Sequence, residues 1–260
     1  MQNLIKAEFM RIRKDKTSLI GLIVVLGLTV VNALITILFQ KVFSNESMPP
    51  VMLDGITSLQ MAFLNGNTTF IMVIISAILV VKEFNQHTIR QKIIYGHSRR
   101  NIYLSTLLVV LVYSIIVLVI SALLNMALMS AAFGFSNSSV DHSFNLIFYS
   151  IGIGILFYLA NIVFSSFVSF FMKSTGASIA IIIGVSFLFS ILAVSLTPFM
   201  KDNSFVTFFN KINPNYMITL ILQTDKVVIE DMLYAVISSL SYISLMTVGG
   251  IYLFQKSDIK

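Results

Sequence analysis

Six long intervals of the sequence contain no Asp, Glu, Lys or Arg, and this feature leaves very few folds open to the chain. The intervals are residues 17–40, 55–81, 101–140, 142–172, 174–200 and 232–255. The shortest has 24 residues, whereas a helix needs only about 20 apolar residues to cross a bilayer. Only 11% of the 260 residues are charged, against roughly 25% in soluble domains, so a soluble globule would lack polar surface. The sequence therefore predicts an all-α membrane protein.

We expect one spanning helix in each interval. The interval 101–140 is long enough for two spans, but it ends in SAAFGFSNSSV, whose Gly, Ser and Asn residues are typical of a loop. The prediction is a single transmembrane domain over residues 17–260. Its expected spans are about 18–40, 60–81, 102–126, 146–172, 177–198 and 232–254.

Residues 1–16 carry a different pattern from the spans. Ile5, Phe9 and Ile12 recur at helical spacing, and basic side chains occupy the other side of the same helix. This pattern favours an amphipathic helix that lies in the membrane interface before the first span. A basic leader without fixed structure is the alternative.

The positions of the Lys and Arg residues predict which side of the membrane each loop and terminus faces. With six spans, both termini, the loop 82–101 and residue 173 lie on one side, which carries thirteen basic and four acidic residues. The other side carries four basic and seven acidic residues. The positive-inside rule therefore predicts a multi-pass protein of the plasma membrane with both termini in the cytoplasm. The net charge of +6 follows from this topology and does not indicate nucleic-acid binding.

Two further features concern the interior and the outer side of the bundle. Residues 199–231 are apolar and are interrupted by Pro214, which indicates two short amphipathic or re-entrant pieces between the fifth and sixth spans; a plain loop on the lipid surface is the alternative. The glycines of SIGIGI and the pair Gly249–Gly250 are typical of places where helices pack closely.

The residue types needed for most chemistry are missing. The predicted spans contain no charged residue, which argues against proton-coupled or sodium-coupled transport and against an enzyme embedded in the membrane. The sequence has no phosphate-binding P-loop and no cysteine, and its three histidines lack partners at metal-ligand spacing. We therefore predict no catalytic residue and no metal site, and any energy for transport must come from a partner.

The most basic interior segment is the loop 82–101. Ile89 and Ile93 lie on one face of a short helix, polar residues flank them, and Gly96 is suited to end it. Such a helix across the cytoplasmic end of the bundle is able to dock into a groove of a soluble subunit. A solvated basic loop that serves only to orient the spans is the alternative.

Several residues of this loop resemble the first cytoplasmic loop of ABC-2 type transporter permeases. They are Glu83-Phe84, Thr88-Ile89-Arg90, Lys92, Gly96, Ser98-Arg99 and Ile102-Tyr103-Leu104-Ser105. The N-terminal segment LIKAEFMRIRKDKTSL also resembles the family's interfacial helix. The sequence departs from the family pattern at His87, where the family usually has Gly, and at Thr106, where it often has Lys or Asn.

The resemblance implies a permease subunit of an exporter, with the loop acting as a coupling helix against a separate ATP-binding subunit. ATP and magnesium would bind to that subunit, and two copies of it would join two permease chains, alike or different. Apolar, uncharged spans suit a hydrophobic or amphipathic cargo such as a peptide, and exporters of phenol-soluble modulins or of the bacteriocin-immunity kind are similar. The alternative is a channel or immunity protein that binds a toxin without ATP. The implied ATPase interface comprises Glu83, Phe84, Thr88, Arg90, Lys92, Gly96, Ser98 and Arg99.

Overall fold

A computed structural model of the protein describes residues 1–43, 54–64, 66–136, 144–196 and 229–257, and all regular elements among these residues are α-helices. Six of the helices are long and apolar enough to cross a membrane. The predicted all-α fold with six candidate spans is confirmed. The six are α2 (Lys16–Phe43), α4 (Gly66–Asn85), α6 (Arg99–Phe133), α7 (Phe144–Met172), α8 (Thr175–Leu196) and α11 (Ile229–Lys256).

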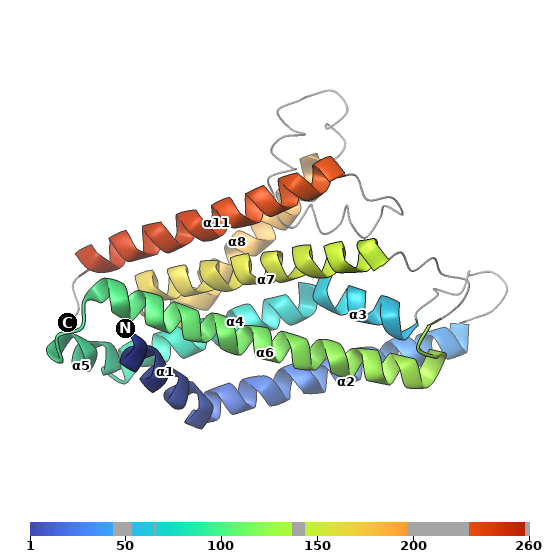
Figure 1. Ribbon diagram of the computed structural model, residues 1–260, viewed down its shortest axis with the longest axis horizontal. Helices are drawn as coiled ribbons and strands as arrows, with labels where there is room; N and C mark the ends of the chain where they lie inside the picture. Colours follow the sequence, from blue (N-terminus) through green and yellow to red (C-terminus); the bar gives the residue numbers. More distant parts are fainter. Residues whose placement is uncertain (44–53, 65, 137–143, 197–228, 258–260) are drawn as a thin grey trace.

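The six long helices run along a common direction, and the remaining helices lie near the two ends of the bundle (Figure 1). The two short helices α1 (Gln2–Lys14) and α5 (Thr88–Ile94) share one end with both chain termini. In the most apolar window of each span, 56% of α4 and 61% of α7 is buried, against 11% of α2, α8 and α11. The centre of the fold is therefore α4 and α7 with α6, and the other three spans present apolar surface outward.

The interval 55–81 forms two helices instead of one. A separate helix, α3 (Gly55–Leu64), precedes α4 and packs on α6 and α7. Its start is fixed by the Asp54 carboxylate, which accepts hydrogen bonds from the Thr57 backbone N–H at 2.8 Å and hydroxyl at 2.7 Å. The Gly55 N–H also donates to the carbonyl of Gly134 at 3.0 Å. The second span is therefore α4, which begins six residues after the expected residue 60.

The ends of the other spans also differ in detail from the expected ones. α6 continues to Phe133, beyond the expected end at residue 126, because Ala131 and Ala132 favour a helix and Gly134, at φ +90°, ends it. The pieces predicted between the fifth and sixth spans fall mainly on residues 197–228, which lie outside the described part of the chain.

Serine hydroxyls connect the central helices. The Ser76 hydroxyl of α4 lies 2.9 Å from the Ser165 hydroxyl of α7, which in turn donates to the carbonyl of Val73 at 2.7 Å. The Tyr158 hydroxyl of α7 donates to the carbonyl of Ser114 in α6 at 2.8 Å. In a membrane, such bonds hold helices together because lipid offers buried polar groups no partner. These serines therefore act in packing within one chain.

Candidate functional site: a buried ionic cluster beside an exposed helix

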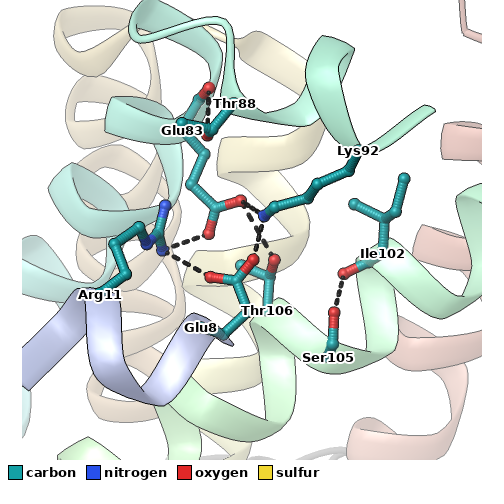
Figure 2. Close-up of polar contacts among 8 residues, drawn as sticks. All are labelled: Glu8, Arg11, Glu83, Thr88, Lys92, Ile102, Ser105 and Thr106. Atoms are coloured by element: carbon teal, nitrogen blue, oxygen red, sulfur yellow. Dashed lines mark hydrogen bonds and ion pairs between the residues drawn. The ribbon is translucent and has the colours of Figure 1, made fainter. Parts of the chain in front are cut away.

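Four charged side chains from three helices meet at the end of the bundle that holds both termini. Glu8 and Arg11 come from α1, Glu83 from the end of α4, and Lys92 from α5 (Figure 2). The Arg11 guanidinium contacts both carboxylates and lies 3.0 Å from Glu8 Oε2. The Lys92 ammonium also contacts both and lies 2.6 Å from Glu83 Oε2. A hydroxyl of α6, Thr106 Oγ1, donates to Glu83 Oε2 at 3.3 Å. We call these five residues the ionic cluster.

The ionic cluster is buried and electrically balanced. The side chain of Glu83 is fully buried, Glu8 is 2% exposed, and Lys92 and Arg11 keep 14% and 24% of their side-chain surface exposed. Two carboxylates face two cations, so no net charge has to be buried. Because an unpaired buried charge is very costly, each member needs its partners in place. The ionic cluster therefore ties α1, α4, α5 and α6 to one another.

Burial changes the pKa of the Glu8 carboxyl, and this change affects stability. Loss of hydration raises the pKa of the Glu8 carboxyl above its ordinary value of 4.5, and repulsion from Glu83 adds to the rise, while Lys92 and Arg11 oppose it. A carboxyl with a raised pKa binds its proton more tightly in the folded protein than in the unfolded one. Its contribution to the free energy of unfolding is therefore greatest at low pH, and it declines as the pH rises from about 4.5 to the raised pKa.

We expect Glu8→Gln to remove this loss of unfolding free energy with rising pH, because glutamine keeps the size of the side chain and does not titrate. Thermal unfolding of purified wild type and variant between about pH 4.5 and pH 8 measures the effect. The wild type should lose stability with rising pH over this window relative to the variant. Parallel curves for the two proteins would contradict the assignment.

A second ionic contact fixes the junction between α1 and α2. Lys82 of α4 pairs with the carboxylate of Asp15 and donates to the Thr17 hydroxyl at 2.8 Å. Asp15 also accepts from the Thr17 N–H at 2.9 Å, so it caps the start of α2. Burial by itself raises the pKa of Asp15, but the hydrogen bonds from Lys82 and Thr17 outweigh it and lower the pKa. The second half of α1 and the residue that follows it are thus joined to α4 through Arg11 and Asp15.

The helix predicted in the loop 82–101 is present as α5. The residue before it, His87, has φ +55°, in the left-handed region that glycine adopts more readily than other residues. The helix ends in a Schellman motif: Gly96, at φ +83°, donates to the carbonyl of Ile93 and His97 to that of Lys92. Ile89, 1% exposed, packs into the hydrophobic core of the bundle.

One side of α5 is exposed, and so is the residue that follows its end. Arg90 and Gln91 are exposed, and so are two large residues, Ile94 at 75% and Tyr95 at 81%. The opposite side holds Lys92 in the ionic cluster. The helix therefore has an inner side fixed to the bundle and an outer side open to a partner.

The structure divides the eight residues of the implied ATPase interface among several places. Glu83 and Lys92 belong to the ionic cluster, and the Thr88 hydroxyl donates to the Glu83 backbone carbonyl at 3.0 Å. Half-buried Phe84 stacks edge to face on Phe170 with ring centroids 5.6 Å apart.

The other four lie on or near the surface. Arg90 and Gly96 are exposed. Ser98 caps α6 by accepting a hydrogen bond from the Asn101 N–H at 3.4 Å. The Arg99 guanidinium donates to the carbonyls of Gln255 and Ser257, at 2.8 and 2.6 Å, and thereby ties the loop to the end of α11. Contact of these residues with an ATPase stays a prediction.

Sequence reasoning missed Glu8, Arg11 and Thr106 as members of the ionic cluster. The buried side of α1 consists of Leu4, Glu8 and Ile12, whereas Phe9, expected on the apolar side, is 45% exposed. The spacing of four residues between Leu4, Glu8 and Ile12 placed a carboxylate within an apolar stripe, and this was the available signal.

Comparison with known proteins agrees with this architecture. The sequence profile of a family described as ABC-2 family transporter protein matches residues 4–193, which include most of α1, the ionic cluster, α5 and five of the six candidate spans. A comparison with curated proteins gave no match. The chain is a multi-pass membrane protein that belongs to the ABC-2 transporter family, whose members are the membrane permeases of ABC transporters.

Proposed function

We propose that the chain is the permease subunit of an exporter driven by a separate ATP-binding subunit, and that α5 is the coupling helix between the two. The observation that carries this proposal is the outer side of α5. Ile94 and Tyr95 are large, apolar or amphipathic, and more than 70% exposed at the end of the bundle. Tyr and Arg are among the residues that most often dominate protein interfaces, and here both Tyr95 and Arg90 are exposed.

The inner side of α5 supports a path for the transmitted motion. Lys92 links α5 to Glu83 at the end of the α4 span and to Glu8 on α1. A push on α5 by the ATPase would therefore reach the spans through ion pairs, and packed helices transmit such displacements as rigid bodies. The Arg99 contact with the end of α11 would carry the same motion to the last span.

The same proposal includes a complex of two permease chains, alike or different, with two ATP-binding subunits in the plasma membrane. The outward apolar surfaces of α2, α8 and α11 offer room for a second permease chain as well as for lipid. The end with α1, α5 and both termini lies in the cytoplasm, as the excess of Lys and Arg favours.

For the cargo we propose a hydrophobic or amphipathic molecule, most simply a peptide. The candidate spans contain almost no charged residues, and a highly charged polymer would find no partner among them. The competing function is a toxin-binding immunity protein or channel that works without ATP. That function makes no use of the exposed side of α5.

The test is the double substitution Arg90→Glu/Tyr95→Ser, measured in complexes with the ABC-type ATP-binding subunit that co-purifies with the wild-type chain. The variant should bind the ATPase at least about tenfold more weakly, since an aromatic and a basic anchor are lost together. It should also lose ATP hydrolysis stimulated by an amphipathic peptide. Both properties are measured on the co-purified complex.

The matched control is Arg13→Glu/Phe9→Ser, which makes the same changes to an exposed basic and an exposed aromatic residue of α1. The control should assemble and hydrolyse ATP as the wild type does. If the α5 variant assembles normally and keeps its peptide stimulation, α5 is not the coupling helix. Toxin protection that persists without any ATPase would then favour the competing function.

A further inference from the structure

A pocket of about 250 Å³ lies between α7 and α11 at the end of the bundle that holds α1 and α5. Its walls are strongly apolar: Phe167, Phe170 and Phe171 of α7 face Leu253 and Phe254 of α11. Lys256 stands at its rim. Drug-sized ligands occupy sites of about 300–1,000 Å³, so this pocket suits part of a flexible chain better than a whole folded ligand.

The floor of the pocket is rigid and its mouth is open. Phe170 and Phe254 are buried, and their ring centroids are 5.1 Å apart in an edge-to-face contact. Towards the surface, Phe171 is 58% exposed and Leu253 37%. The opening lies near the polar ends of two candidate spans, where the headgroup region of the bilayer begins. An acyl chain of a membrane lipid is therefore within reach of the pocket.

The cation at the rim of the pocket favours lipids with an anionic headgroup. Lys256 is exposed, and its ammonium lies 4.3 Å from the centre of the Tyr252 ring and donates to the hydroxyl of that residue. Lys256 itself belongs to the pocket lining, and the stem of a lysine at such a place reaches towards headgroups. An anionic headgroup gains about 1 kcal/mol for each such cation near the membrane surface. A zwitterionic headgroup lacks the net charge for this gain, and a cationic peptide would be repelled.

We propose that this pocket binds one acyl chain of an anionic phospholipid, with the lipid phosphate paired to Lys256. The bound lipid fills the gap between the ends of α7 and α11 that the phenylalanines leave open. The inference uses only the membrane location of the chain, and it does not depend on peptide export or on the coupling role of α5.

The experiment compares lipids that share acyl chains and differ in headgroup. The protein, purified in a neutral detergent, is titrated with phosphatidylglycerol or phosphatidylcholine, and bound lipid is counted by native mass spectrometry. The wild type should bind phosphatidylglycerol more tightly. Lys256→Gln should weaken phosphatidylglycerol binding about fivefold, the equivalent of ~1 kcal/mol, and leave phosphatidylcholine binding unchanged. Leu253→Trp should weaken both, because the indole occupies the space of the acyl chain.

Two variants serve as controls. Leu245→Trp places the same side chain on an exposed position of α11 outside the pocket, and Arg13→Gln removes an exposed cation from α1. Neither should change lipid binding. Equal binding of the two lipids, or equal losses in test and control variants, would overturn the proposal. If Leu253→Trp changes the oligomeric state and leaves lipid binding intact, the pocket is instead a contact between copies of the chain.

Discussion

Replacing Glu83 with alanine is expected to lower the free energy of unfolding by about 3 kcal/mol. Glu83 is fully buried and accepts contacts from Arg11, Lys92 and Thr106. Its loss leaves Glu8 as the one carboxylate of the ionic cluster against two cations. Breaking a buried pair typically costs about 3–5 kcal/mol, and the lower end applies here because Arg11 and Lys92 keep part of their surface in water. Thermal or denaturant unfolding in one detergent or lipid environment measures the change.

The charge balance can be tested separately from the lost volume. Glu83→Gln keeps the size of the side chain and removes only its charge, so it should retain most of the penalty. Adding Lys92→Met to Glu83→Gln removes one charge of each sign and restores a neutral pair of Glu8 and Arg11. The double variant should therefore be more stable than the sum of the two single changes indicates. Simple additivity in this double-mutant cycle would show that the four charges do not act as a unit.

The same variants distinguish binding of the ATPase from transmission of its motion to the spans. The double variant keeps the exposed side of α5, with Ile94 and Tyr95, and breaks its link to Glu83. Under the proposed function it should bind the ATPase and respond weakly to the peptide. This outcome differs from that of Arg90→Glu/Tyr95→Ser, which is expected to lose binding itself.

Local patterns were sufficient to predict much of this molecule. The uncharged intervals predicted six spans, because a bilayer tolerates few charges along a spanning helix. Ile89, Ile93 and Gly96 indicated a short helix that ends near Gly96, and α5 lies at this place in the structure. In each case the physical cause lies within a few consecutive residues.

Contacts between distant residues were not predictable in the same way. Glu8 and Lys92 are 84 positions apart in the sequence, and they meet only because α1 packs on α6, and α5 on α4 and α6, at the same end of the bundle. The sequence counted both as surface charges of one membrane face. Likewise α7 passes close to the end of α3, and no pattern within residues 55–81 records this contact.

That close passage gives the second large prediction. A β-carbon at position 154 of α7 would lie 2.7 Å from the backbone carbonyl oxygen of Phe63, near the end of α3. Since the obstacle is backbone, Gly154→Ala has to push two helices apart instead of turning a side chain. Overpacking of this kind costs about 1–3 kcal/mol. At position 152, one half-turn away on the same helix, a β-carbon would meet nothing within 4 Å.

Gly152→Ala is therefore the matched control for Gly154→Ala. Both substitutions gain the same helix propensity, up to about 1 kcal/mol, so their difference in unfolding free energy isolates the clash with Phe63. We expect Gly154→Ala to be the less stable of the two by about 1–3 kcal/mol in thermal unfolding measurements. Equal stability would mean that α7 can move away from the end of α3 at little cost. The contact between α7 and the end of α3 would then be a loose one.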